Sequence, residues 1–243
     1  MNSKDTKGKI AVVTGANRGM GFEACRQLGK LGFRVVLTSR DAKKAEEAAS
    51  KLRDEGLDVV AHAHDVNDPQ SAEGLASFVE SEYGEVHVLV NNAAAIFDIE
   101  EDDSASILAT SKEALTRSFE TNTIGAVLTA QALVPLMKKT GYGRIVNVSS
   151  GMGGITEMNG GYPGYRLSKA ALNAVVRSLT VDLKDRGVTA VVFHPGWVST
   201  DMGGDSAPVT PETSVHGLRE AIEGLSLADS GRFLNYDGTE IPW

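Results

Sequence analysis

The segment GYPGYRLSK, residues 161 to 169, contains two tyrosines and a lysine whose types and spacing suit proton transfer. A phenol has an ordinary pKa of about 10, so it exchanges protons at neutral pH only where a neighbouring cation favours its ionised form. Tyr165 and Lys169 are four residues apart in a predicted helix, which places them on one face. Tyr162 has the same spacing to Arg166, but it precedes a Pro-Gly pair that we do not expect to be helical. The pattern predicts Tyr165 and Lys169 as the acid–base pair, with a surface tyrosine and lysine as the alternative.

A glycine-rich turn, TGANRGMG, follows the apolar run IAVVT and precedes a helical pattern. Glycines at such a turn let the backbone approach a pyrophosphate, whose charge is attracted by the N–H groups and dipole of the next helix. A plain tight turn is the alternative interpretation. The residues of this turn that we expect to contact a dinucleotide are Gly15, Asn17, Arg18, Gly19, Met20 and Gly21.

The residues at the end of the second apolar run indicate which dinucleotide the chain binds. An unphosphorylated ribose favours an acidic residue at this position. The run ends instead in Thr38, Ser39 and Arg40. A guanidinium grips a phosphate with two charge-assisted hydrogen bonds, and Arg18 can approach from the other side. The sequence therefore favours NADP(H) over NAD(H), unless Arg40 is simply a solvated charge before a helix.

These residues must be positioned by elements that alternate along the chain. Continuous runs of Val, Ile and Leu are typical of parallel strands buried on both faces. The predicted strands are residues 10–14, 34–39, 59–66, 86–93, 143–150, 188–196 and 231–237. The predicted helices between them are residues 22–32, 41–56 with Asp41 as N-cap and Gly56 as stop, 68–84, a segment within 101–139, and 165–186. The pattern predicts an α/β fold: a single doubly wound Rossmann-type domain over residues 1–243, with a mostly parallel seven-stranded sheet flanked by helices.

Two Gly- or Pro-rich stretches, 151–164 and 203–217, are expected to stay irregular. Both follow strands, and loops at the carboxyl ends of parallel strands are where such sheets bind ligands. We therefore expect them to be substrate-side loops, with 203–217 as a lid. The acidic segment 100–106 is expected to be a solvated loop near the substrate mouth.

Composition narrows the class of protein. The chain has 243 residues, 42% of them hydrophobic, which suits one substantial core. Its net charge of -8 argues against binding to nucleic acid or anionic membranes. The single cysteine excludes an internal disulfide, and the five histidines lack the spacing of zinc ligands, so no metal is expected. The N-terminal MNSKDTKGK lacks the apolar core of a signal peptide, and we expect a cytoplasmic enzyme.

Seven motifs occur in an order and spacing that resemble the short-chain dehydrogenase/reductase family over residues 10 to 202. They are TGANRGMG, Asp65-Val66, VNNAA (90–94), Asn122 in TNTIG, VNVSS (146–150), YRLSK and HPGWVSTDM. The segments VVLTSRD, HPGWVSTDM and FLNYDGTEIPW are most similar to the NADPH-dependent carbonyl reductases of that family.

The resemblance implies catalytic roles. Tyr165 would protonate a carbonyl oxygen as hydride reaches its carbon, while Lys169 lowers the phenol pKa and binds the nicotinamide ribose. Ser150 would hydrogen-bond the same oxygen, with the neighbouring Ser149 as the alternative. Asn122 would kink its helix and hold a water linked to the lysine; a buried polar residue bonded to backbone is the alternative.

The resemblance also implies cofactor contacts at the strand ends. Besides Ser39 and Arg40, it assigns them to Asp65, Val66, Asn92, Ala93, Tyr165, Lys169, Pro195, Gly196, Val198 and Thr200. The sequence departs from the family's NNAG pattern at Ala94, where a methyl group could shift the loop.

The expected function is NADPH-dependent reduction of a ketone or aldehyde. The alternatives are a 3-oxoacyl-thioester reductase, which would use the same catalytic residues, and a non-catalytic NADP(H)-sensing protein. A homo-oligomer, dimer or tetramer, is expected because the helices at 101–139 and 165–186 are free to pair between subunits. Residues that could form an apolar substrate pocket, or equally part of the core, are Phe97, Met152, Trp197 and Met202.

Overall fold

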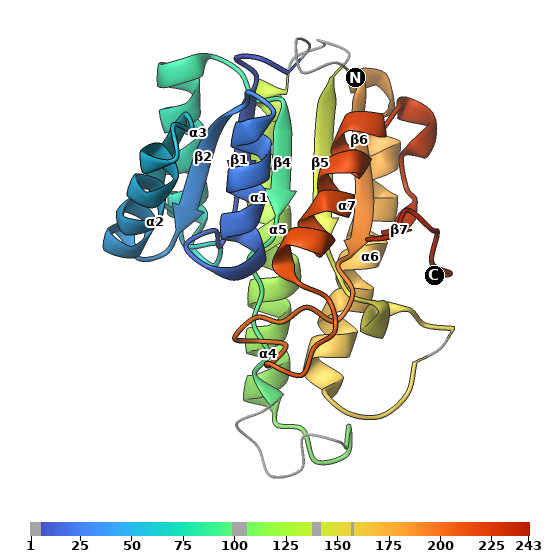
Figure 1. Cartoon of the computed structure of the whole chain (residues 1–243). Coiled ribbons are helices and arrows are strands. Elements are labelled where there is room, and N and C mark those ends of the chain that lie inside the picture. Colours follow the sequence, from blue (N-terminus) through green and yellow to red (C-terminus); the bar gives the residue numbers. More distant parts are fainter. Residues whose placement is uncertain (1–5, 99–105, 138–141, 157) are drawn as a thin grey trace.

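A computed structural model describes residues 6–98, 106–137, 142–156 and 158–243 of the chain (Figure 1). At its centre is a seven-stranded sheet with the order β3-β2-β1-β4-β5-β6-β7, in which all neighbouring strands are parallel. The predicted α/β fold is therefore confirmed. The strands are β1 (Ile10–Val13), β2 (Arg34–Ser39), β3 (Val59–Ala63), β4 (Val88–Asn91), β5 (Gly143–Val148), β6 (Val188–His194) and β7 (Phe233–Asn235).

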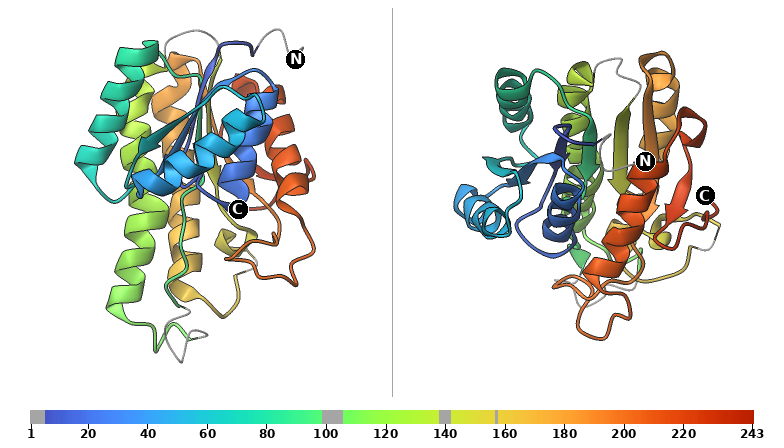
Figure 2. Two further views of the ribbon diagram at one scale, coloured as in Figure 1. Left: turned by 60° about the vertical axis from the view of Figure 1, so that its left-hand side comes forward. Right: turned by 45° about the horizontal axis from the view of Figure 1, so that its top comes forward.

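Helices cover both faces of the sheet, as the two views in Figure 2 show. One layer consists of α1 (Gly19–Lys30), α2 (Ala42–Asp54) and α7 (Pro211–Gly224). The other consists of α3 (Pro69–Tyr83), α5 (Gly125–Leu133) and α6 (Pro163–Leu183). Short 3₁₀ turns lie at Val134–Leu136, Gly151–Gly153, Lys184–Arg186 and Leu227–Asp229. None of the helices in the described part of the chain has the length and apolar character needed to span a membrane.

A further helix extends beyond the carboxyl edge of the sheet, beside the first turns of α6. This is α4 (Lys112–Phe119), which continues into α5 through a π-helical turn, Glu120–Ile124 (Figure 1). A single π-helical turn inside an α-helix frequently marks a functional site.

The strands alternate their side chains between the two helical layers. Val12 packs in the layer that contains Leu75 of α3, whereas its neighbour Val13 packs in the layer that contains Leu28 of α1. All four side chains are fully buried, and each such burial contributes about 1.5–3 kcal/mol. Continuous apolar strands are needed because both faces of the sheet are covered.

Local signals in the sequence correctly predict where α2 begins and ends. The Asp41 carboxylate caps α2 by accepting from the backbone N–H groups of Lys43 and Lys44, at 3.0 and 3.1 Å. Gly56, the predicted stop, lies just beyond the helix with a φ of +80°. Side chains that accept from free N–H groups of a first turn fix where a helix begins.

The prediction that all of 203–217 is irregular is wrong, because α7 already begins at Pro211. The Thr210 hydroxyl accepts from the N–H of Thr213 at 3.2 Å, and Pro211 occupies the first helical position. A side-chain cap followed by proline is a standard helix start. Similarly, α6 begins at Pro163, two residues before the predicted start.

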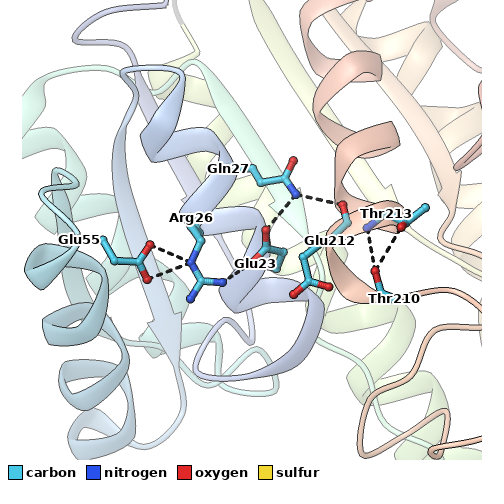
Figure 3. Close-up of polar contacts among 7 residues, drawn as sticks. All are labelled: Glu23, Arg26, Gln27, Glu55, Thr210, Glu212 and Thr213. Atoms are coloured by element: carbon cyan, nitrogen blue, oxygen red, sulfur yellow. Dashed lines mark hydrogen bonds and ion pairs between the residues drawn. The ribbon is translucent and has the colours of Figure 1, made fainter.

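Polar contacts fix α1 to the helices on either side of it (Figure 3). Arg26 forms ion pairs with Glu23 of α1 and, at 3.0 Å, with Glu55 at the end of α2. Gln27 donates to Glu23 at 2.9 Å and to the Glu212 main-chain oxygen of α7 at 3.1 Å. These contacts fix α1, which follows the glycine-rich turn, between α2 and α7.

Candidate active site

A cleft of about 1300 Å³ lies at the carboxyl ends of the strands, where the strand order reverses between β1 and β4. Open parallel sheets bind ligands at this switch point. Gly196 and Val198 are not among the residues that line the cleft. The predicted cofactor residues that do line it are Gly15, Asn17, Arg18, Gly19, Met20, Gly21, Ser39, Arg40, Asp65, Val66, Asn92, Ala93, Tyr165, Lys169, Pro195 and Thr200.

Glycines let the turn before α1 pack against β4. A Cβ atom on Gly15 would lie 2.8 Å from Ala93 Cα, and one on Gly21 would lie 2.5 Å from the side-chain nitrogen of Asn92. Asn92 donates from that nitrogen to main-chain oxygens of the turn at 2.9 and 3.1 Å. Arg18, the N-cap residue of α1, makes no capping side-chain hydrogen bond. The first N–H groups of α1 therefore remain suited to an anion, as in other helix N-termini.

Cations gather where β2 ends. Ser39 is buried, and the exposed Arg40 lines the cleft beside it. Lys44, which the sequence reasoning missed, also lines the cleft, from the first turn of α2. Asp41 lines the cleft as well, but one of its carboxylate oxygens caps α2.

Arg18 reaches the cleft from the glycine-rich turn, as predicted, but it is not a free cation. Its guanidinium forms an exposed ion pair with Asp201, in the segment that follows β6. This ion pair joins the first strand-to-helix connection to the predicted substrate side.

Tyr165 lies in the first turn of α6 and is buried. Burial raises the pKa of its phenol to about 12, while a side-chain hydrogen bond with Ser150 lowers it. Ser149 borders the cleft, but its hydroxyl donates to the Asn173 side chain at 2.7 Å. Ser150 is not among the residues that line the cleft, but its side chain is the one that lowers the phenol pKa.

Lys169 lies one turn after Tyr165 and is also buried. Its Nζ lies 5.7 Å from the centre of the Tyr165 ring and donates to the Val148 main-chain oxygen at 2.8 Å. Burial lowers the pKa of Lys169 to about 7. The expected lowering of the phenol pKa by Lys169 is not seen, because burial is the largest influence on both groups.

Asn122 occupies the π-helical turn between α4 and α5, where the sequence places a kink. It is buried, and its side chain accepts from Ala95 N at 2.8 Å and donates to Ala95 O at 2.9 Å. It also donates to the Ser168 hydroxyl at 3.0 Å. Asn122 therefore joins the cleft-lining loop after β4 to α6, and these contacts match the alternative of a buried residue bonded to backbone.

Asp98 is a residue of the site that sequence reasoning missed. Its buried carboxylate accepts from the backbone N–H groups of Gly164 and Tyr165, each at 3.0 Å. Tyr162, the residue before α6, offers no side-chain cap and has a φ of +50°, which is unusual for a residue other than glycine. The absence of a capping side chain at Tyr162 is the signal that a distant cap is required. The Pro-Gly pair expected to be non-helical forms the first turn of α6, although Tyr162 itself lies outside the helix.

The predicted apolar pocket is brought together only in part. Phe97 and Met202 line the cleft. Met152 and Trp197 are not among its lining residues, and Trp197 is 57% exposed with its indole N–H donating to Gly203 O at 2.7 Å. The acidic segment 100–106 lies outside the described residues except for Ser106.

Two further observations bear on the chemistry of the cleft. Arg117, which sequence reasoning also missed, lines the cleft with its guanidinium carbon 4.2 Å from the Phe97 ring centre. Within the described residues, no group of three or more His, Cys, Asp or Glu side chains is placed to hold a metal ion.

Comparisons with known proteins identify the family and the fold. The model of the short chain dehydrogenase family matches residues 9–209. The C-signal of Myxococcus xanthus is 40% identical over 167 residues, which cover 66% of this chain and 94% of that protein. The 3-oxoacyl-acyl-carrier-protein reductase FabG of Escherichia coli (strain K12) is 33% identical over 196 residues, 81% of this chain and 76% of that protein. The NADPH-bound carbonyl reductase from chicken fatty liver superposes with a TM-score of 0.88 at 32% identity, covering 98% of this chain and 100% of that one.

Proposed function

The chain belongs to the short-chain dehydrogenase/reductase family, and we propose that it uses NADPH to reduce a ketone or an aldehyde to an alcohol. The observation that carries this proposal is the buried phenol of Tyr165, which lines the cleft together with Lys169, whose Nζ lies 5.7 Å from the centre of the phenol ring. The carbonyl reductase with NADPH bound, which shares the fold over nearly the whole chain, supports the same reaction class.

The residues of the cleft fit a phosphorylated dinucleotide. Arg40 and Lys44 line the end where β2 finishes, and Ser39 stands where an unphosphorylated ribose would favour an acid. These cations would hold the 2′-phosphate, and the first N–H groups of α1 would face the pyrophosphate. When bound, NADPH supplies the hydride.

Tyr165 would supply the proton. A phenol with a pKa of about 12 keeps its proton throughout the neutral range, so it is present as an acid for reduction. As the carbonyl carbon accepts hydride, negative charge grows on its oxygen, and the Tyr165 hydroxyl can donate to it. Ser150, whose side chain influences the same phenol, would hydrogen-bond the carbonyl oxygen and hold it in place; one such hydrogen-bond donor typically contributes about 10²–10³ in kcat.

Lys169 would stabilise the phenolate that is left after proton transfer. Below pH 7 its ammonium form predominates, because its pKa is about 7. An ammonium 5.7 Å from the ring centre would act against burial, which has the larger effect on the phenol pKa. Asn122 would act as a positioning residue, since it fixes the loop after β4 and does not line the cleft.

A 3-oxoacyl-thioester reductase is the second candidate, favoured by the 33% identity to the FabG protein. The test is NADPH oxidation, followed by absorbance, across aryl ketones, aldehydes, diketones and acetoacetyl thioesters, with NADH in parallel. Turnover of simple carbonyl compounds supports the first candidate, and turnover restricted to thioesters supports the second. Tight NADPH binding without turnover of any compound would favour a sensor.

We also propose a homo-oligomer, dimer or tetramer. Ile124, in the π-helical turn, and Val181, near the end of α6, are apolar side chains that are 48% and 75% exposed. Light scattering coupled to size exclusion tests this proposal, and a mass of a single chain of 25.7 kDa would contradict it.

A further inference from the structure

We propose that His194 is a positioning residue for Ser150, and that its neutral imidazole holds the turn that carries this serine. Protonation of the imidazole would release the turn and reduce turnover. This inference rests on the proposed function, in which Ser150 orients the carbonyl oxygen.

The contact joins two neighbouring strand ends. His194 is the last residue of β6, beside β5, which ends at Val148 just before Ser150. The Gly151 N–H donates to Nδ1 of His194 at 3.0 Å. The ring packs closely against this glycine, because a Cβ atom on Gly151 would lie 3.3 Å from Nε2.

The bonded N–H is the one that fixes Ser150. Gly151 begins the 3₁₀ turn Gly151–Gly153, and the N–H groups at the start of such a turn have no partner within it. The peptide bond between Ser150 and Gly151 is planar, so an anchor on the Gly151 nitrogen also limits the rotation of Ser150. The side-chain oxygen of Ser150 accepts a hydrogen bond from the Met152 N–H at 3.1 Å. The same turn therefore also supports the Ser150 side chain directly.

Only the neutral imidazole can accept this hydrogen bond. Neutral histidine has one donor and one acceptor nitrogen, whereas both nitrogens of the protonated ring are donors. With Nδ1 accepting, the proton of the neutral ring lies on Nε2. On protonation the Gly151 N–H would face a second donor, and the turn would have to move. A misplacement of about 1 Å near the reacting atoms can reduce the rate about 10²-fold.

The surroundings of His194 keep the ring neutral in the neutral range. Burial lowers the pKa of His194, and the negative charge of Asp237 acts in the opposite direction. Asp237 follows β7, the strand that pairs with His194 through Asn235. Among the described residues Asp237 is the one charged group that affects this pKa, and Gly151, Met152 and Asn235 are uncharged.

The first experiment measures kcat against pH for the wild type, His194→Asn and His194→Ala. The Asn side-chain oxygen can replace Nδ1 as acceptor but does not titrate. We expect kcat of the wild type to fall on acidification, the fall to be absent in His194→Asn, and His194→Ala to be reduced about 10- to 100-fold even at neutral pH. In Asp237→Asn the acid limb should move to lower pH, because a group that favours protonation is removed.

His87 offers a matched control, since its Nδ1 accepts from the backbone N–H of Ile10 at 3.1 Å, beside the amino ends of β1 and β4. His87→Asn should keep the acid limb of the wild type. An unchanged acid limb in His194→Asn, or wild-type kcat in His194→Ala, would overturn the proposal.

A second measurement does not depend on activity. The Gly151 amide signal in ¹H–¹⁵N NMR spectra should shift with pH in the wild type and stay constant in His194→Asn. Its constancy in the wild type would refute the inference about His194, whereas a shifting amide in a protein without reductase activity would leave the inference intact and overturn the proposed function.

Discussion

The carboxylate of Asp98 accepts a hydrogen bond from the backbone N–H of Tyr165 at 3.0 Å, across 67 positions of sequence. Its other oxygen accepts from Gly164, so both free N–H groups of this first turn of α6 are capped from the loop after β4. The same loop lines the cleft through Phe97 and its neighbours. The Asp98 carboxylate therefore joins the proposed proton donor to the loop after β4, a link that Asn122 makes a second time through Ala95 and Ser168.

We expect Asp98→Ala to lower both stability and kcat. Loss of a helix cap costs about 0.5–2 kcal/mol, and here it also frees the turn that carries Tyr165. Thermal unfolding and steady-state kinetics measure the two effects. Asp68→Ala is the matched control, since Asp68 caps α3 by accepting from Gln70 N at 3.0 Å. The control should lose stability while keeping kcat, and equal kcat losses in the two variants would argue against a positioning role for Asp98.

Tyr165→Phe should lower kcat by about 10²–10⁴, because the general acid is removed. The dissociation constant for NADPH, measured by fluorescence titration, should change little, since the phenol hydroxyl contributes to the chemical step. Turnover close to that of the wild type would refute the proposed mechanism.

Ser150→Ala and Ser149→Ala should differ, although the two residues are adjacent. Ser150 is the serine whose side chain lowers the phenol pKa of Tyr165, and its loss should lower kcat about 10²- to 10³-fold. Ser149 donates to Asn173, so its removal should mainly affect stability. Steady-state kinetics with melting curves for both variants decide this, and a larger loss of kcat in Ser149→Ala would reverse the assignment.

Arg40→Ala should weaken NADPH binding about 10- to 100-fold, as expected for one charge-assisted interaction, and leave NADH binding nearly unchanged. Fluorescence titration with both nucleotides measures the preference. Lys43→Ala is the control, because Lys43 is exposed, contacts Glu47 at 3.9 Å and is not among the cleft residues. A parallel loss of NADH affinity in Arg40→Ala would show that the arginine does not select the 2′-phosphate.

The free energy of unfolding should fall between pH 6.5 and about 4. Burial lowers the pKa of His64 from its ordinary 6.5 to about 4, while its ring contacts Ser71 and Thr129 at 3.2 and 3.0 Å. In this range the unfolded chain takes up a proton that the folded chain does not, so stability is complete above pH 6.5 and is lost as pH falls, by about 3 kcal/mol in full. Urea titrations at pH 7 and pH 5 test this, and His64→Gln should show a smaller difference. An equal difference in that variant would mean that other groups dominate.

Much of the fold could be predicted from the sequence because its determinants are local. The strand at 34–39 and the Asp41 cap are set by neighbouring residues, and both are confirmed. Thr210 and Pro211 carried an equally local signal for the start of α7, but the glycines and prolines before them favoured a loop.

Parts of the site could not be predicted because they depend on distant contacts or on burial. Asp98 and His194 accept hydrogen bonds from backbone N–H groups 66 and 43 positions away in the sequence. No local sequence pattern identifies the distant partner in such a contact. The phenol pKa of Tyr165 is set chiefly by burial, so the spacing to Lys169 suggested the wrong direction. Trp197 comes soon after β6 in the sequence, but its side chain is exposed to solvent.

The reversal of strand order between β1 and β4 separates the residues proposed to select the nucleotide from those proposed to transfer the proton. The proposed nucleotide-selecting cations all follow β1 or β2, whereas the proposed proton chemistry belongs to β5 and α6. Exchange of Arg40 or Lys44 could therefore switch coenzyme preference without disturbing the proposed acid, and divergence of the loop after β5 could create new substrate ranges while the coenzyme site stays unchanged. Such independence is a reason why one scaffold can diversify by small, separable steps.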